Sequence, residues 1–127
     1  MSKEIILTSA APAPIGPYSQ AVRAGNFVFV SGQIALDPSS GIMADQDIES
    51  ETRQVMANLE SVLGAAGSGF SHVVKCTIFL RNMDDFPVVN RIYGTFFTSE
   101  PPARETVEVS RLPKDGRVEI SCIAIVA

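Results

Sequence analysis

The alternation of apolar and polar residues along this chain predicts both helices and strands. Apolar side chains recur every three or four positions over 47–66 and again from Phe86 to Phe97, which is typical of amphipathic helices. Shorter apolar runs bounded by Gly, Pro or Asp indicate strands. These runs lie at 4–8, 20–24, 27–32, 73–80, 105–109 and 118–127. The predicted order of elements is therefore β-β-β-α-β-α-β-β.

Turn and capping residues mark the ends of these elements. Gly25-Asn26 is a suitable two-residue turn for a hairpin between the second and third strands. Asp47 is placed to cap the first helix, and the glycines at 64, 67 and 69 predict its end. Pro87 is tolerated in the first turn of the second helix. The boundaries of both helices can thus be predicted from local chemistry.

The final run, Val118 to Ala127, is apolar at nearly every position, which favours a strand covered on both faces. With 127 residues the chain is long enough for one domain, 1–127, that buries a sizeable core. The order of elements predicts an α+β fold, with two helices on one face of a mixed sheet. The opposite face is then left for neighbouring copies, so the protein is expected to oligomerise.

Charge and composition narrow the classes of function. The formal net charge is -4 and the sequence pI is about 4.9, so no basic surface for a phosphate backbone is expected. The N-terminal apolar segment is too short for a secretory signal, and no run approaches the ~18 residues that span a bilayer. A cytoplasmic protein with no nucleic-acid or membrane partner is predicted. Cys76 and Cys122 lie in apolar runs, which indicates buried free thiols, and the single His72 has no companion ligands for a metal.

Arg104 is the first candidate for binding chemistry. Pro101 and Pro102 end the preceding helical segment and stiffen the entry to a strand, where Arg104 can present its planar guanidinium to a carboxylate. A hairpin through Pro113–Gly116 is expected to bring Glu119 back beside Arg104, pairing an anion binder with an acid/base group. Taken alone, an Arg or Glu in such a position is more often an ordinary surface residue. Gly32, at the end of a strand, either lets a ligand approach the backbone or simply closes a turn.

Several short motifs together resemble the RidA (YjgF) family of reactive-intermediate deaminases, over essentially the whole chain. The motifs are Gly16-Pro17-Tyr18-Ser19-Gln20-Ala21, Phe29-Val30-Ser31-Gly32-Gln33, Pro101-Pro102-Ala103-Arg104, Leu112-Pro113 and Val118-Glu119-Ile120. This resemblance implies a chorismate-mutase-like fold, assembled as a homotrimer with sites in clefts between subunits.

The resemblance also implies an activity: hydrolysis of 2-enamine and 2-imine acids, such as 2-iminobutanoate and 2-iminopropanoate, to 2-oxo acids and ammonia. Arg104 would hold the substrate carboxylate, and Glu119 would take a proton from water and deliver one to the leaving nitrogen. Neither a metal nor a cofactor is expected. The remaining substrate-binding residues that it implies are Tyr18, Ser31, Gly32, Asn90 and Thr106.

Two positions depart from the family pattern, because Thr106 stands where many relatives carry Cys and Ser121 where relatives often have a second acid. Glu119 is therefore the only candidate base on its strand. An alternative interpretation is a non-catalytic trimeric protein that binds small acids such as 2-oxobutanoate. An endoribonuclease or translation inhibitor is a further alternative, disfavoured by the acidic balance and the lack of a basic, aromatic groove.

Overall fold

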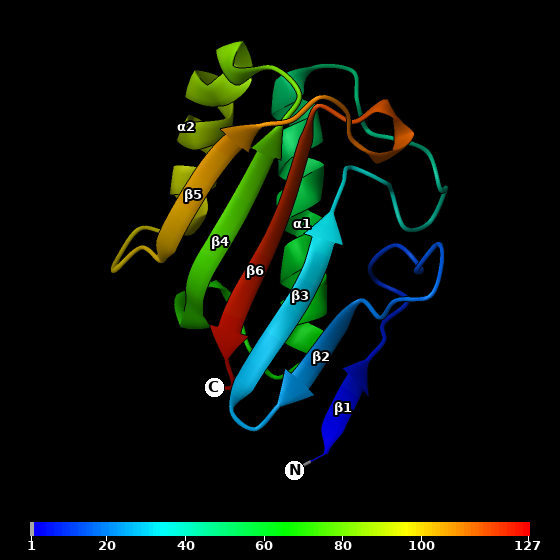
Figure 1. Ribbon diagram of the computed structural model, residues 1–127, viewed down its shortest axis with the longest axis vertical. Coiled ribbons are helices and arrows are strands. Elements are labelled where there is room, and N and C mark those ends of the chain that lie inside the picture. The colour runs from blue at the N-terminus through cyan, green and yellow to red at the C-terminus, as the bar shows by residue number, and fades with distance from the viewer. Residues whose placement is uncertain (1) are drawn as a thin grey trace.

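The computed structural model describes residues 2–127 and consists of one six-stranded sheet with two helices packed against it (Figure 1). The elements follow the order predicted from the sequence. They are β1 (Lys3–Ile6), β2 (Ala21–Ala24), β3 (Phe27–Gln33), α1 (Ile48–Ala65), β4 (Val73–Leu80), α2 (Phe86–Phe96), β5 (Ala103–Glu108) and β6 (Val118–Ile125). Short 3₁₀ turns occur at Phe70–His72, Met83–Asp85 and Pro113–Asp115.

The spatial order of the strands is β1-β2-β3-β6-β4-β5. All neighbours are antiparallel except β4 and β5, which run parallel because α2 connects them as a crossover. The sheet is therefore mixed, as predicted. β6 lies between β3 and β4, and every second residue from Val118 to Ala124 is buried. Coverage of its other face, which the sequence pattern predicts, stays a prediction.

The predicted hairpin between the strands that carry Arg104 and Glu119 is wrong. The segment Pro113–Asp115 forms a 3₁₀ turn, and β6 then returns to the middle of the sheet instead of pairing with β5. β4 therefore separates the two strands. The physical reason is burial: β6 has apolar residues on both faces and takes a central position, whereas β5 is exposed and occupies an edge.

Both helices lie behind the sheet in the view of Figure 1, on the same face. Asp47 caps α1, where its carboxylate accepts a hydrogen bond of 2.6 Å from the Ser50 amide, and Pro87 occupies the first turn of α2. The core lies between this helical layer and the sheet. Cys76 and Cys122 face each other in register across β4 and β6, and both are buried and free, as predicted.

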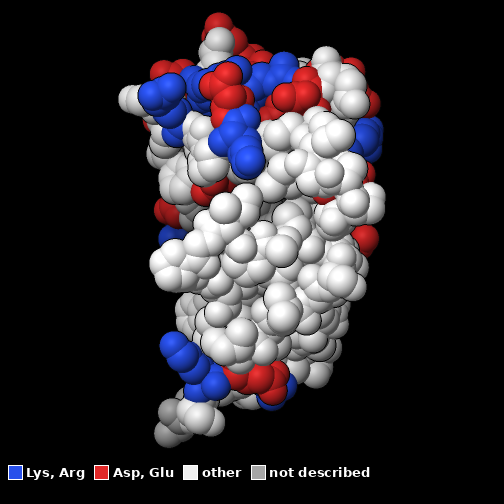
Figure 2. All heavy atoms as spheres, turned by 90° about the vertical axis from the view of Figure 1, so that its right-hand side faces the viewer, with Lys and Arg blue, Asp and Glu red and all other residues white. Residues whose placement is uncertain are grey.

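The other face of the sheet carries apolar side chains that nothing covers in one chain. Phe27 and Phe29 of β3 are about half exposed, as are Val107 of β5 and Ile125 of β6. Seen from the side of the molecule that carries β1, charged residues gather at the two ends, while the broad surface between them is largely uncharged (Figure 2). Within residues 2–127, no helix combines the length and apolar character needed to cross a bilayer.

Candidate functional site

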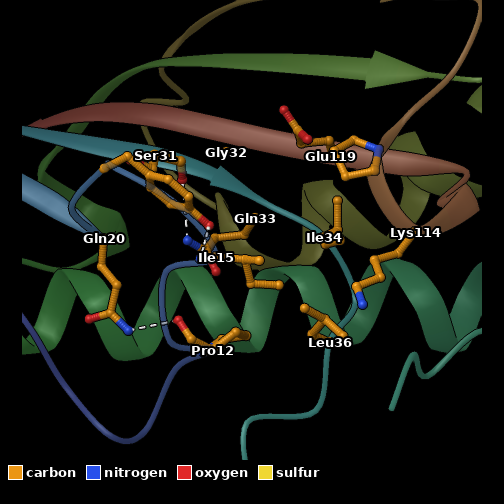
Figure 3. Close-up of a pocket in the computed structure, with 12 residues that line it drawn as sticks. Pro12, Ile15, Gln20, Ser31, Gly32, Gln33, Ile34, Leu36, Lys114 and Glu119 are labelled. Atoms are coloured by element: carbon orange, nitrogen blue, oxygen red, sulfur yellow. Dashed lines mark hydrogen bonds between the residues drawn. The ribbon is translucent and has the colours of Figure 1, made fainter. Parts of the chain in front are cut away.

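A cavity of about 530 Å³ opens at the end of β3 and contains four of the predicted site residues (Figure 3). Tyr18 and Ser31 come from the segment before β2 and from β3, Gly32 follows in β3, and Glu119 comes from β6. The other lining residues are Pro12, Ile15, Gln20, Gln33, Ile34, Leu36, Pro113 and Lys114. This lining is mostly apolar with a few converging polar groups, which is the usual composition of a small-molecule site.

Glu119 is the acid of this cavity. Its side chain is half-buried, and burial alone raises the pKa of its carboxyl group above the ordinary value of 4.5. No donor among the side chains and backbone of residues 2–127 forms a hydrogen bond with this carboxylate. A half-desolvated carboxyl group without a fixed partner is suited to exchange protons with a bound ligand.

Gly32 lies directly against the side chain of Glu119. A Cβ atom at position 32 would lie only 2.8 Å from the carboxyl carbon of Glu119 and 3.1 Å from its Cγ. These distances are shorter than ordinary van der Waals contact. Gly32 lies within β3 and does not close a turn, and the group beside its backbone is the Glu119 side chain. Approach of a ligand to this backbone stays a prediction.

Ser31 and Tyr18 are held by the backbone of the segment that precedes β2. The Ser31 hydroxyl donates to the Ser19 carbonyl at 2.6 Å, and the Ser31 amide donates to the Gln20 carbonyl at 2.9 Å. The Tyr18 hydroxyl accepts a hydrogen bond of 3.2 Å from the Ile15 amide. Tyr18 remains 51% exposed, so its ring stands at the mouth of the cavity, free to contact a ligand.

Gln20 fixes the outer wall of the cavity and was not identified as a site residue from the sequence. It is fully buried, and its amide nitrogen donates to the carbonyls of Thr8 (3.0 Å), Ala11 (3.3 Å) and Pro12 (2.8 Å). Its amide oxygen accepts from the Thr8 amide at 2.7 Å. One side chain thus satisfies backbone groups of a proline-rich loop that has no strand partner there. Its position in the Gly16–Ala21 motif was the only available signal.

Arg104 lies outside the cavity, at the exposed edge of the sheet. Its guanidinium donates a hydrogen bond of 2.7 Å to Asn90 of α2 and lies over the rings of Phe86 and Tyr93, 5.5 Å and 5.0 Å from their centroids. The hydroxyl of Thr106, two residues along the same strand, is buried and has no hydrogen-bond partner within residues 2–127. Arg104, Asn90 and Thr106 therefore form a second group of predicted site residues.

The two groups are well separated within one chain. Arg104 pairs with Cys76 of β4 and Glu119 pairs with Phe79, so the two residues differ by two strands and by three positions along β4. At about 4.8 Å between strands and 3.3 Å per residue, their Cα atoms lie roughly 14 Å apart. They also project from opposite faces, since Arg104 packs on α2 and Glu119 stands on the face without helices. Within one chain, Arg104 and Glu119 are therefore too far apart to contact the same small ligand.

A buried ion pair sets the start of the strand that carries Glu119. Glu51 of α1 is fully buried and accepts hydrogen bonds from the backbone amide and the Nε of Arg117, at 2.6 Å and 2.7 Å. Arg117 also donates to the Asp45 carbonyl at 2.8 Å. Two residues later the chain reaches Glu119, so this pair fixes the position of the acid. No local sequence signal indicates this pair, because Glu51 and Arg117 are 66 residues apart.

Comparison with known proteins shows close relatives over nearly the whole chain. Residues 8–126 match the family model described as Endoribonuclease L-PSP. A RutC family protein of Pyrococcus horikoshii is 51% identical, with 96% of this chain and 97% of that protein covered. A protein of Mus musculus named 2-iminobutanoate/2-iminopropanoate deaminase is 46% identical, with 97% and 91% covered. The crystal structure of E. coli TdcF with bound serine superposes with a TM-score of 0.93 at 38% identity, covering 98% of this chain and 99% of that one.

Proposed function

This chain belongs to the Endoribonuclease L-PSP family, also called the RidA or YjgF family, and we propose that it hydrolyses reactive 2-imino and 2-enamine acids to 2-oxo acids and ammonia. Candidate substrates are 2-iminobutanoate and 2-iminopropanoate, which a relative's name specifies. The observation that carries the proposal is Glu119, a half-buried carboxyl group without a fixed partner inside a cavity of small-molecule size.

The proposed reaction needs one acid/base group and one anion binder. The oxygen of a water molecule adds to the C=N carbon while Glu119 accepts the water proton. Glu119 then delivers this proton to the nitrogen, which gives a carbinolamine. Glu119 next transfers the proton of the new hydroxyl group to the amine nitrogen as the C–N bond breaks, which releases ammonia and leaves the 2-oxo acid. Arg104 would hold the substrate carboxylate through its planar fork, supported by Asn90, while Tyr18 and Ser31 orient the substrate. The backbone at Gly32 and the free hydroxyl of Thr106 are further proposed contacts.

We propose that the complete site forms between subunits of a homotrimer. Arg104 and Glu119 cannot reach one substrate within a chain, but Arg104 is exposed at an edge and is available to a neighbour. The uncovered apolar side chains of Phe27, Phe29 and Ile125 supply a surface that cyclic association can bury. Sedimentation in dilute buffer is expected to give a trimer, and a monomer that still hydrolyses imines would contradict the shared site.

A second candidate function is a non-catalytic binder of small acids. It is favoured by the relative whose structure holds bound serine, a molecule with the same carboxylate next to a nitrogen-bearing carbon. Such a binder needs Arg104 but has no need for proton exchange at Glu119. By contrast, Lys114 is the only Lys or Arg among the cavity-lining residues, which does not favour binding of a phosphate backbone.

The deciding experiment pairs ammonia release with ligand affinity. Imines are generated in situ by an amino-acid oxidase or a pyridoxal-phosphate dehydratase, and 2-oxobutanoate is titrated by calorimetry on the same protein. An enzyme accelerates ammonia release over buffer, and Glu119→Gln lowers this turnover about a hundredfold or more while affinity for 2-oxobutanoate persists. A wild-type protein that binds 2-oxobutanoate without accelerating hydrolysis is a binder. Wild-type turnover in the Glu119→Gln variant removes Glu119 from the mechanism.

A further inference from the structure

Lys114 is the one cationic side chain that lines the cavity, and it has no role in the proposed reaction. In Figure 3, Lys114 extends beside Ile34 and Leu36, whereas the Glu119 carboxylate points away on the other side of the strand. No acidic group within residues 2–127 comes within ion-pair distance of the Lys114 ammonium. Among the described residues that line the cavity, Lys114 thus supplies an exposed cation without a paired acid, and Glu119 supplies the carboxyl group.

The backbone beneath Lys114 is held in an unusual conformation. Lys114 and Asp115 both adopt left-handed φ angles, 57° and 58°, which residues with a Cβ rarely occupy. The turn is closed by a 3.1 Å hydrogen bond from the Gly116 amide to the Pro113 carbonyl. Arg81 anchors it from β4's end by donating to the Asp115 carbonyl at 2.7 Å and to the Asp115 carboxylate at 3.1 Å. The turn therefore presents Lys114 to the cavity from a fixed backbone.

A free ammonium in a concave site recognises an anionic group on the ligand. In the proposed reaction, the 1-carboxylate of the substrate is bound by Arg104, so Lys114 is available for a second anion at the far end of the substrate side chain. A cavity of about 530 Å³ accommodates an extended five-carbon acid. Dicarboxylic substrates place their two carboxylates at the two ends of such a molecule, with the C=N carbon near one of them.

We propose that Lys114 binds the distal carboxylate of dicarboxylic ligands, so that the protein favours the 2-imino acids of acidic amino acids over uncharged ones of equal length. The preference in hydrolysis rests on the proposed function, whereas the binding of a distal carboxylate by Lys114 does not. The matched pair of substrates is 2-iminoglutarate and 2-iminopentanoate, which differ in the distal carboxylate and share the same chain of five carbons. Their products, 2-oxoglutarate and 2-oxopentanoate, form the matched pair for binding.

The test compares Lys114→Met, which removes the charge, with Lys114→Arg, which retains it. The ratio of kcat/KM for 2-iminoglutarate over 2-iminopentanoate is expected to fall about tenfold in Lys114→Met, the usual effect of losing one charged contact. In Lys114→Arg, this kcat/KM ratio is expected to stay close to that of the wild type. Lys3→Met is the control, because it removes the same charge from β1, an exposed strand that contributes nothing to the cavity lining. Its ratio is expected to equal that of the wild type.

Calorimetric titration of the two oxo acids separates this inference from the proposed function. If no imine is hydrolysed, but 2-oxoglutarate binds and Lys114→Met lowers its affinity about tenfold relative to 2-oxopentanoate, the reaction is wrong and the Lys114 subsite stands. A different result would refute the subsite and leave the reaction standing. In that case 2-iminopentanoate is hydrolysed, but Lys114→Met changes neither the kcat/KM ratio of the two imino acids nor the affinity ratio of the two oxo acids. Failure of 2-oxoglutarate to bind the wild-type protein, or an equal loss in Lys3→Met, also overturns the subsite.

Discussion

Replacing Gly32 by Ala tests whether the position of the Glu119 carboxyl group controls the reaction. The added Cβ would lie 2.8 Å from the carboxyl carbon, and carbon atoms in contact prefer about 3.5–4.0 Å, so the carboxyl group must retreat by roughly 1 Å. A misplacement of about 1 Å in a catalytic group can cost about a hundredfold in rate, or roughly 2.7 kcal/mol of activation free energy. We therefore expect kcat for imine hydrolysis to fall about a hundredfold in Gly32→Ala.

The assay is steady-state ammonia release from 2-iminobutanoate, with thermal unfolding measured on the same samples. Gly64→Ala provides a matched control, because Gly64 lies in α1 and a Cβ there would meet nothing within 4 Å. Its kcat is expected to equal that of the wild type. Glu119→Asp shortens the acid by one methylene group and relieves the contact. The effects of Gly32→Ala and Glu119→Asp should therefore not be additive in the double variant.

The reasoning is refuted if Gly32→Ala keeps a kcat within twofold of the wild type while remaining folded. It is also refuted if Gly64→Ala loses as much activity, since the loss would then come from a general effect of adding a methyl group. Additive losses in the double variant would mean that position 32 acts on the reaction by some route other than the carboxyl group of Glu119.

Three further predictions concern charged groups. Burial raises the pKa of Glu119, so its ionised form disfavours folding, and Glu119→Gln should be more stable than the wild type at pH 7. This difference should shrink as the pH falls through the raised pKa and vanish below the ordinary value of 4.5, and equal urea stability at pH 7 would contradict this. Arg104→Lys keeps the charge but loses the planar guanidinium that can bind a carboxylate through two hydrogen bonds, so kcat/KM for imine hydrolysis should fall ten- to a hundredfold. Unchanged kinetics would exclude Arg104 as the group that binds the substrate carboxylate. Glu51→Gln leaves the charge of Arg117 uncompensated and should lower the free energy of unfolding by about 3 kcal/mol; a loss below 1 kcal/mol in urea denaturation would show that the pair contributes little.

The sequence predicted elements whose signals are local. Asp47 and Pro87 mark the first turns of the two helices because capping and proline chemistry act within a few residues. The apolar run at 118–127 predicted a strand, which is β6, but the pattern of apolar residues did not specify which strands lie beside it in the sheet. The helical layer on one face followed from the same patterns of burial.

The rest depends on contacts between distant parts of the chain. The pairing of Arg104 with Glu119 was inferred from their short sequence separation, but strand order is set by burial across the whole sheet, and β4 came between them. Gln20 and Glu51 read as ordinary polar residues, because their partners in the loop at 8–12 and at Arg117 are brought to them only by the tertiary fold. Lys114 reads as part of a turn until the cavity beside it is seen.

The two thiols, which face each other beneath the helices, have a consequence for the chemical stability of the protein if it hydrolyses imines as proposed. The C=N carbon of an imine is electrophilic, and the reactive form of cysteine is the thiolate. Burial raises the pKa of both Cys76 and Cys122, so little thiolate forms at neutral pH, and neither sulfur is accessible from solvent. Thr106, a proposed substrate contact, carries a hydroxyl group and no thiol, and both cysteines are buried, so we expect the proposed substrates to leave the cysteines of this chain unmodified.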